Sequence, residues 1–449
     1  MRKTEKEVLE YSQHAIDIIA KKEMTKEEIE AFTAEVVDNF NNFVNPGTLE
    51  YRKSAADDYT SIEWIDEKDG FYDLKGRKYI DWLGGFGVFS HGHRHPKVVE
   101  TVKNQLSKQA LGSAELLDGN RSMLAKILAD VTPGDLKYTF FTSSGTEAVE
   151  CALKMAMMAT GRHYFITGTQ DFHGKSLGAL SLTGKGVYRE PFLPMLQGVR
   201  HVPFGDFDYL KKTVESMAYI GELPAAMIFE PIEGEIGVII PPDDYFPKVR
   251  ELCDEYDILL IADEVQTGLG RTGKLFAVDH WDVKPDILTL AKAMGGGVMP
   301  LSACVCTERC YEKFMYDNPW MHSTTTGGNP LACAAGIAGM NVMLEEDLSG
   351  QAAEKGAYLM EKLAVLQEKY KDIMVEIRGK GLLIVMVFCD DEKGYQVVTE
   401  MFGRGVLLSG TETNARCIRI EPPLTITYEH IDAGLAALEE SLAAVAAKA

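Results

Sequence analysis

The chain has 449 residues, of which 46% are hydrophobic and 25% are charged, a composition typical of a soluble globular protein. Its 46 basic and 67 acidic residues give a net charge of −21, which argues against a nucleic-acid partner and against an anionic membrane surface. No apolar run approaches the length of a membrane span, the segment from Met1 to Ile29 lacks the apolar stretch of a signal peptide, and the eight cysteines are too scattered for a disulfide framework. We therefore expect a cytoplasmic protein.

The first 94 residues predict helices followed by a small antiparallel sheet. One or two amphipathic helices end at Asn45-Pro46-Gly47. The stretch IEWIDEKDGFYDLKGRKYIDWLGG then alternates apolar and polar residues around Asp-Gly and Lys-Gly turns, which is typical of short paired strands.

Residues 95–329 predict a large α/β domain. Helical patterns alternate there with five short apolar runs: YTFFT, HYFIT, AAMIFEP, ILLIADE and ILTLA. These runs are continuously apolar, as parallel strands buried on both faces should be, so ligands belong at their carboxyl ends. Residues 330–449 begin with a helix from Pro330 to Glu346, continue with strands such as LLIVMVF and end in an Ala-rich helix. We expect them to form a smaller α+β domain.

Small hydroxyl residues and a glycine follow the first apolar run and precede a clear helix. Ser144, Gly145 and Thr146 would offer backbone N–H groups, hydroxyl donors and a favourable helix dipole to a phosphate. An ordinary helix cap has the same composition, and taken alone the cap is the better interpretation.

Two later strand ends carry an aromatic ring and a buried acid. Phe172 and His173 lie in a glycine-flanked turn after HYFIT and could stack on a flat ring, although packing explains them equally when taken alone. Asp263 ends ILLIA, where a buried carboxylate is costly unless it faces a cation such as a protonated pyridine nitrogen. The alternative for Asp263 is an acid that caps the next turn.

The run ILTL leads directly to Lys292, which precedes three glycines. A partly desolvated amine has a lowered pKa and can act as the nucleophile that forms a Schiff base, whereas the alternative is a lysine that reaches the surface. A phosphate cradle, a stacking ring, a buried acid and a buried lysine thus occur in order after apolar strands. Together they correspond to every part of pyridoxal phosphate.

Three other patterns are better explained by structure than by ligands. The segment 268–273, GLGRTG, matches the dinucleotide-binding glycine pattern, but it lies several residues after its strand and no clear helix follows it. The alternating histidines His91, His93 and His95 lie in a Gly/Pro turn. Cys304, Cys306 and Cys310 also lack ligands at metal spacing, so we predict no metal site.

The chain resembles the class III aminotransferases of fold type I, and within that family the bacterial putrescine aminotransferases. The likeness covers almost the whole chain and includes the stretches LGGFGVFSHGH, SSGTEAVE, FHGKSLGAL, ADEVQTGLGRTG, LAKAMGGGVMP, TGGNPLACAAG and RIEPPLT. It implies a large domain with a mostly parallel sheet flanked by helices, and a smaller α+β domain built from both ends of the chain.

The resemblance also implies roles for individual residues. Lys292 holds the cofactor and moves the proton, Asp263 pairs with the pyridine nitrogen, and Gln266 contacts the ring hydroxyl. Gly145 and Thr146 bind the phosphate, with Ser144 and His173 beside the cofactor, and Phe172 stacks on the ring. Thr325 binds the phosphate of a neighbouring subunit, which implies a homodimer or a larger homo-oligomer.

By the same resemblance, an amine donor and a 2-oxo acid such as 2-oxoglutarate or pyruvate react in turn, through pyridoxamine phosphate. Glu235 and Arg419 match a pair in which the arginine is released from the glutamate to bind the acceptor's carboxylate. The alternative for Arg419 is an ordinary strand-end ion pair. Phe89 and Ala114 are further candidates for contact with the substrate.

The sequence departs from the family pattern at several positions. Glu233 replaces a glutamine and Ile236 a glycine, while Thr326 stands in place of Phe or Tyr, and Gly112 and Ala114 are smaller than expected. These small residues favour amines bulkier than a linear diamine, although neutral drift explains them as well. The alternatives to a diamine aminotransferase are a transaminase of bulkier amines or ω-amino acids, an aminomutase or decarboxylase on the same fold, a dinucleotide-dependent oxidoreductase, and a catalytically silent binding protein.

Overall fold

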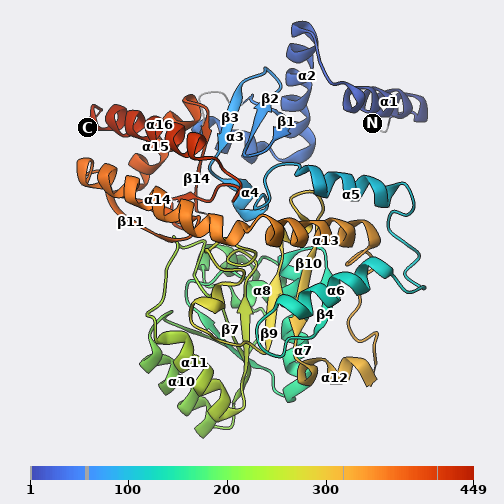
Figure 1. Ribbon diagram of the computed structural model, residues 1–449, viewed down its shortest axis with the longest axis vertical. Helices are drawn as coiled ribbons and strands as arrows, with labels where there is room; N and C mark the ends of the chain where they lie inside the picture. Colours follow the sequence, from blue (N-terminus) through green and yellow to red (C-terminus); the bar gives the residue numbers. More distant parts are fainter. Residues whose placement is uncertain (1–2, 56–59, 317, 412, 449) are drawn as a thin grey trace. The chain divides into compact units, whose positions relative to one another are not determined.

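The computed structural model describes residues 3–55, 60–316, 318–411 and 413–448. The chain divides into two compact units, of which the first comprises Met1–Ile65 and Tyr72–Arg77 and the second comprises Asp66–Phe71 and Lys78–Ala449. Figure 1 follows the chain through both. The three-part division at residues 94 and 329 stays a prediction.

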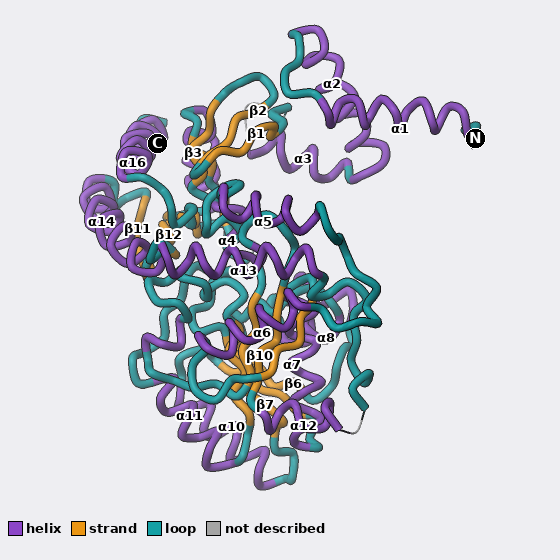
Figure 2. The backbone as a smooth tube through the Cα atoms, turned by 45° about the vertical axis from the view of Figure 1, so that its right-hand side comes forward, coloured by secondary structure: helices purple, strands orange, loops and turns teal. Residues whose placement is uncertain are grey.

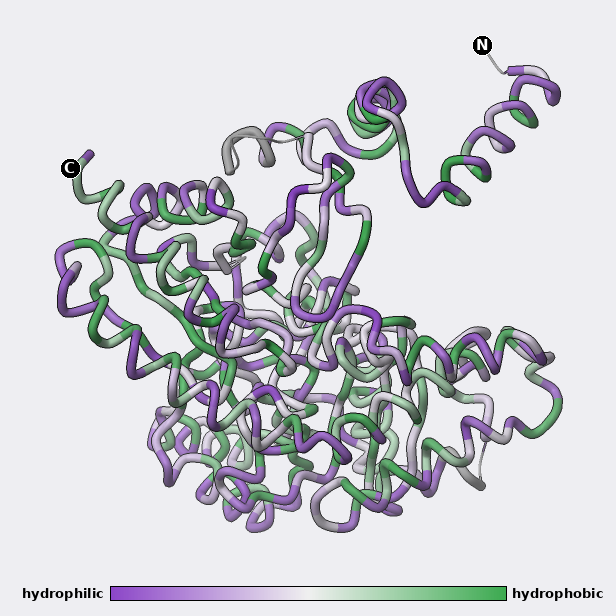
Figure 3. Tube along the Cα trace, turned by 45° about the horizontal axis from the view of Figure 1, so that its top comes forward, coloured by the Kyte–Doolittle hydropathy of each residue, from purple (hydrophilic) through white to green (hydrophobic). Residues whose placement is uncertain are grey.

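The first unit is helical, as its sequence predicts. It contains α1 (Glu5–Ala20), α2 (Lys26–Asn39), the π-helical turn η1 (Phe40–Val44) and α3 (Pro46–Ala55). Thr4 and Thr25 cap the first two helices by accepting hydrogen bonds from the N–H groups of Glu7 and Glu28, each at 3.3 Å. Polar and apolar residues alternate along α1 in Figure 3, and no residue of α1 or α2 is buried.

The helix α3 was not predicted, because Asn45-Pro46-Gly47 was interpreted only as the end of the preceding helix. Proline is favoured at the first position of a helix, where its missing N–H costs nothing, so the same residues also start a helix. The predicted strands follow as β1 (Glu63–Glu67), β2 (Gly70–Asp73) and β3 (Lys78–Asp81). The first two of these contain residues of both units.

A seven-stranded sheet forms the centre of the second unit, in the order β4-β10-β9-β8-β7-β5-β6. Its strands are β4 (Tyr138–Thr142), β5 (Tyr164–Gly168), β6 (Val199–Val202), β7 (Pro224–Phe229), β8 (Leu259–Asp263), β9 (Ile287–Leu290) and β10 (Ser302–Cys306). All five apolar runs are therefore strands, as predicted. The LSACVC segment forms β10.

The direction of β10 corrects one expectation about this sheet. Strand β4 does not lie beside a parallel strand, because it pairs with β10, which is antiparallel to both β4 and β9. Strand β4 lies at the sheet edge, and three of its five residues are only half-buried. Since β4 and β9 still run in the same direction, the carboxyl ends of β4, β5, β8 and β9 meet at one edge.

Helices cover both faces of this sheet, as Figure 2 shows. On one face, α7 (Gly145–Thr160) and α8 (Leu177–Leu182) pack on residues such as Phe165 and Ile261. On the other, α10 (Phe207–Tyr219) and α11 (Tyr245–Tyr256) pack on alternate residues such as Ile166 and Leu260. Burial on both faces explains why these strands lack polar residues. The same unit also contains α4 (Gly84–Gly87), α5 (Pro96–Leu106), α6 (Gly119–Val131), α9 (Gly186–Arg189), η2 (Glu190–Phe192), η3 (Ala277–His280), η4 (Lys292–Gly295) and α12 (Glu308–Tyr316).

The C-terminal part begins with α13 (Pro330–Glu345), within one residue of the predicted helix, and α14 (Leu348–Lys369). A second sheet follows in the order β11-β12-β15-β14, with all pairs antiparallel. The elements here are β11 (Met374–Lys380), β12 (Leu383–Phe388), α15 (Asp391–Gly403), β13 (Val406–Leu407), β14 (Ser409–Gly410), β15 (Cys417–Ile420) and α16 (Tyr428–Ala446). Strand β13 pairs in parallel with β3. Among the described residues, no helix has the length and apolar character needed to cross a membrane.

Trp82, in the segment directly after β3, packs against the last helix. Its side chain is fully buried in the largest hydrophobic cluster, together with Leu438 and Leu442 of α16. A Cβ atom added to Gly434 of α16 would lie 2.1 Å from Cζ2 of Trp82, which is far inside van der Waals contact. The close approach of helix and indole therefore requires glycine at this position.

We predict that Gly434→Ala destabilises the protein by about 1–3 kcal/mol, because the added methyl overpacks the core against Trp82. Gly403→Ala in α15 is the matched control, since no atom lies within 4 Å of its added Cβ. That substitution should be neutral or stabilise by up to about 1 kcal/mol. Chemical denaturation of both variants checks this. Equal stability of the two would contradict the packing described for Trp82.

Candidate functional site

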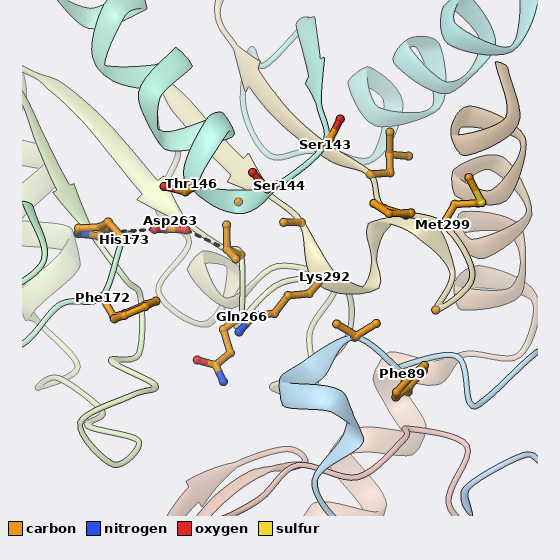
Figure 4. Close-up of a pocket in the computed structure, with 18 of the residues that line it drawn as sticks. Phe89, Ser143, Ser144, Thr146, Phe172, His173, Asp263, Gln266, Lys292 and Met299 are labelled. Carbon is orange, nitrogen blue, oxygen red and sulfur yellow. Dashed lines mark hydrogen bonds and ion pairs between the residues drawn. The ribbon is translucent and has the colours of Figure 1, made fainter. Parts of the chain in front are cut away.

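A cavity of about 530 Å³ opens where the carboxyl ends of the sheet strands meet. Figure 4 shows side chains from separate strand ends directed into this space. The cavity brings together nine residues that the sequence singled out: Phe89, Ser144, Gly145, Thr146, Phe172, His173, Asp263, Gln266 and Lys292.

The amino terminus of α7 forms one wall of the cavity. Glu147 accepts hydrogen bonds from the N–H groups of Ser143, at 2.8 Å, and Ser144, at 3.2 Å, which fixes the turn before the helix. The N–H groups of Gly145 and Thr146 belong to the first helical turn and have no acceptor within the helix. A Cβ on Gly145 would lie 2.9 Å from Cγ1 of Val265, so only glycine allows this close approach. The arrangement suits a bound phosphate.

A chain of buried polar groups runs behind the opposite end of the cavity. Asp263 Oδ2 lies 2.7 Å from Nδ1 of His173, and Nε2 of His173 lies 3.6 Å from Oδ2 of Asp171. Asp263 also accepts from the Thr289 hydroxyl at 2.9 Å. Burial lowers the pKa of His173, but the carboxylates of Asp171 and Asp263 outweigh it and raise this pKa to about 10. The imidazole is thus a cation that pairs with the carboxyl group of Asp263.

Lys292 leaves the end of β9 with a backbone φ of 51°, a left-handed conformation that is strained for a residue with a side chain. Its side chain points toward Gln266 in Figure 4, and among the described residues no hydrogen bond or ion pair holds its amine. Burial lowers the pKa of this amine, against the opposing effect of Glu421 and Glu235. A larger neutral fraction makes the amine a better nucleophile.

The side walls of the cavity fit a flat ring. Phe172 and Val265 line it, and in Figure 4 Phe89 and Met299 lie on the other side of Lys292 from Phe172. The amide nitrogen of Gln266 donates to Glu421 at 3.1 Å and keeps a second hydrogen for a ligand.

A buried arginine cluster lies beside Gln266. Arg419 Nη1 donates to Glu235 Oε1 at 2.8 Å, and Arg419 Nε lies 3.2 Å from Glu421 Oε2. Arg419 is fully buried, and although burial lowers its pKa, Glu235 and Glu421 outweigh this and raise it. The predicted pair of Glu235 and Arg419 is therefore present, with a second carboxylate that was not predicted.

Five predicted residues do not line the cavity. Glu235 and Arg419 belong to the arginine cluster beside it, whereas Ala114, Thr325 and Thr326 are exposed on this chain. The sequence analysis in turn missed Val265, Glu230 and Glu421. The sequence could have revealed Glu421. It follows Arg419 by two residues, and side chains two residues apart in extended backbone point to the same side.

The departure from the family pattern at Glu233 has a physical explanation. Its side chain is fully buried, and neither carboxylate oxygen has a hydrogen-bond partner among the described residues. Burial and then the charge of Asp171 raise the pKa of Glu233 to about 10. The group is therefore a neutral carboxylic acid near neutral pH, as uncharged as the glutamine that it replaces.

Residues of the GLGRTG segment and of the histidine turn make contacts within the protein. Arg271 of the GLGRTG segment is fully buried and donates to the carbonyl of Leu382 at 3.0 Å. His93 lies 2.8 Å from Asp81, and His95 lies 3.0 Å from Glu346.

The geometry fits pyridoxal phosphate in each of its parts. The N–H groups of a helix terminus, a carboxyl group paired with an imidazole, and the amine of Lys292 line one cavity, and these are the groups that the phosphate, the ring nitrogen and the aldehyde of the cofactor require. Glycine at position 145 allows Val265 to pack directly against the start of α7.

Comparison with known proteins agrees with this geometry. A model of the family described as aminotransferase class-III matches residues 57–442. The ornithine aminotransferase of Toxoplasma gondii, with partial occupancy of PLP at its active site, is 28% identical over 100% of this chain and 99% of that one, with a TM-score of 0.83. A thermostable (S)-enantioselective omega-transaminase from Thermomicrobium roseum is 30% identical over 92% and 98%, with a TM-score of 0.84. An amine transaminase from an uncultivated Pseudomonas species, solved with PLP bound, is 31% identical over 86% and 95%, with a TM-score of 0.78.

His173 provides a test of the buried charge chain through pH. Its pKa rises from 6.5 to about 10 on folding, so the stability that it contributes is fully present below pH 6.5 and is lost as the pH rises through 10. We predict that His173→Asn lowers the free energy of unfolding by about 3–5 kcal/mol at acidic pH, because two buried carboxylates lose the cation between them. The deficit should shrink steadily toward pH 10.

Chemical denaturation of the cofactor-stripped protein at several pH values measures this deficit. The exposed His163→Asn is the control and should show no such trend. A deficit independent of pH would show that His173 is not charged in the folded protein.

Proposed function

Because the chain belongs to the class III aminotransferases, we propose that it transfers a terminal amino group from a diamine or similar primary amine to a 2-oxo acid. Membership makes it a pyridoxal phosphate-dependent aminotransferase. The donor resembles putrescine or cadaverine, and the acceptor is 2-oxoglutarate or pyruvate. The observation that supports the choice of donor is the ion pair of Glu235 and Arg419, which neutralises this buried arginine before a donor enters.

Pyridoxal phosphate, when bound, supplies a ring that accepts the electron pair left on the substrate carbon. The chain's own residues hold and orient the reactants. When the cofactor is bound, Lys292 would hold its aldehyde carbon, and the amine, whose pKa is lowered by burial, would remove and return the proton at the substrate carbon. The carboxyl group of Asp263, which pairs with His173, would pair with the ring nitrogen.

The N–H groups of Gly145 and Thr146 and the Ser144 hydroxyl, at the start of α7, would hold the phosphate. Phe172 and Val265 would enclose the ring, and Gln266 would donate to the ring hydroxyl. We also propose that Thr325 of a second copy completes the phosphate site, which is supported by its exposure on this chain and by its absence from this chain's own cavity. The active form would then be at least a homodimer.

Arg419 serves the second half-reaction. The acceptor's carboxylate competes with Glu235 for the arginine, and the side chain of Glu235 moves aside. The backbone around it is tethered, because the Thr413 hydroxyl donates to the carbonyl of Glu235 and Arg378 Nε donates to that of Gly237 at 2.8 Å. A moving side chain on an anchored loop allows the same cavity to take an amine and then an acid.

A transaminase of bulkier amines or ω-amino acids is the second candidate. The similarity to an omega-transaminase and to an ornithine aminotransferase favours it, as do the small side chains at Ala114 and Thr326. An aminomutase or a decarboxylase would act on the same cofactor without net transfer to an added oxo acid.

A panel of donors with 2-oxoglutarate and pyruvate tests these alternatives. We predict that putrescine yields glutamate or alanine, and that Thr326→Phe slows an aryl-alkyl amine at least about tenfold more than putrescine, because the ring would fill space in the pocket of a second copy. Formation of the new amino acid is the measurement.

Two results would contradict the proposal. Product formed from the donor without any new amino acid would indicate a mutase or a decarboxylase. A strong putrescine preference in the natural protein that disappears in Thr326→Phe would contradict the assigned position of Thr326.

A further inference from the structure

Arg419 has two carboxylate partners that are held in different ways. Glu235 reaches it from the turn between Glu233 and Ile239, with Oε1 at 2.8 Å from Nη1. Glu421 follows Arg419 by two residues, directly after the end of β15, and forms an ion pair with Oε2 at 3.2 Å from Nε. Phe86 covers the guanidinium, with its ring centre 5.5 Å from Cζ, and neither Nε nor Nη2 has a hydrogen-bond partner among the described residues.

Glu421 is fixed where Glu235 is able to turn. Its backbone N–H donates to the carbonyl of Trp82 at 2.8 Å, and a Cβ on Gly84 would lie 2.1 Å from its carbonyl oxygen. Its carboxylate is fully buried and accepts from Gln266 Nε2 at 3.1 and 3.3 Å, while Arg271 Nε lies 3.9 Å away. Removal of this carboxylate from Arg419 would therefore require repacking of the backbone.

The same carboxylate is close to the catalytic lysine. A Cβ on Gly87 would lie 2.6 Å from Glu421 Oε1 and 3.6 Å from Lys292 Cδ, so both side chains flank that glycine. Glu421 is also the largest of the charges that oppose the lowering of the Lys292 pKa by burial. One carboxylate therefore contacts the arginine and the glutamine, and acts electrostatically on the lysine.

We propose that Glu421 is a positioning residue that sets substrate specificity, by remaining paired with Arg419 when Glu235 turns away. The arginine then meets the acceptor's carboxylate already partly neutralised, so the acceptor binds more weakly than it would to a lone arginine. In return, a donor without a carboxylate occupies the site without leaving a buried, unpaired guanidinium beside it. The amide of Gln266 is oriented by the same group. This inference rests on the proposed role of Arg419.

The test compares Glu421→Gln with Glu235→Gln in the cofactor-loaded enzyme. Glutarate, a dicarboxylate without an oxo group, is the probe, and its dissociation constant is measured by titration calorimetry. We expect Glu421→Gln to bind glutarate at least about fivefold more tightly, to lower the KM for 2-oxoglutarate and to raise the KM for putrescine. Glu235→Gln should also bind glutarate more tightly, because it removes the carboxylate that competes with glutarate for Arg419.

A spectroscopic measurement separates this role from a purely structural one. Loss of the Glu421 charge near Lys292 should lower the pH at which the visible absorbance of the bound cofactor changes. Glu421→Asp, which keeps the charge but draws it back by one carbon, should lie between the natural protein and Glu421→Gln in both measurements. It also provides the test if Glu421→Gln fails to fold.

Unchanged or weaker glutarate binding in a folded Glu421→Gln or Glu421→Asp variant would overturn the inference. Arg419→Met separates this failure from failure of the proposed function. If Arg419→Met leaves glutarate binding intact, the acceptor site itself is wrongly placed. If Arg419→Met abolishes binding while Glu421→Gln leaves it unchanged, only the role of Glu421 is wrong.

Discussion

An amine, a carboxylate and an imidazole are withdrawn from water at the same edge of one sheet, and the rest of the site depends on how each is compensated. Burial lowers the pKa of Lys292 toward the neutral, reactive form. His173 lies 2.7 Å from Asp263, and its imidazole, with a pKa raised to about 10, is a buried cation beside that carboxyl group. A reactive amine and a cationic imidazole therefore occur at one edge of the sheet, because burial dominates at Lys292 and nearby carboxylates dominate at His173.

In the arginine cluster, two carboxylates act as counter-ions of one buried guanidinium. Arg419 is buried completely, so an amine donor that offers no carboxylate would leave it unpaired if its partners moved away. Glu235 is attached to an anchored turn and Glu421 to the strand that carries Arg419 itself. The charge of Arg419 is therefore neutralised by one carboxylate that can move and by one that stays in place. This arrangement allows one cavity to bind two substrates of different charge in succession.

The sequence predicts the sheet strands and brings together most of the residues that line the cavity, for physical reasons. Continuously apolar runs such as ILLIA specify strands buried on both faces, and polar residues directly after them must lie at the strand ends, where Asp263 and Lys292 are found. Periodicity did not reveal the antiparallel direction of β10 or the start of α3 at Pro46, because neither feature changes the pattern of apolar residues. Glu421 escaped notice since its partners, Gln266 and Arg271, lie some 150 residues away. Contacts of that kind exist only once the fold is formed. The sequence likewise did not reveal that Ala114, Thr325 and Thr326 are exposed on this chain, because exposure depends on the folded arrangement around them.

Borohydride reduction of the purified, cofactor-loaded protein, followed by peptide mass spectrometry, tests the central claim most directly. Reduction converts a Schiff base into a stable bond, so the modified lysine keeps the pyridoxyl group through digestion. The account predicts the label on the peptide that contains Lys292, and no label there when Lys292 is replaced by alanine. A label on another lysine of the natural protein, or covalent attachment that survives in Lys292→Ala, would contradict it.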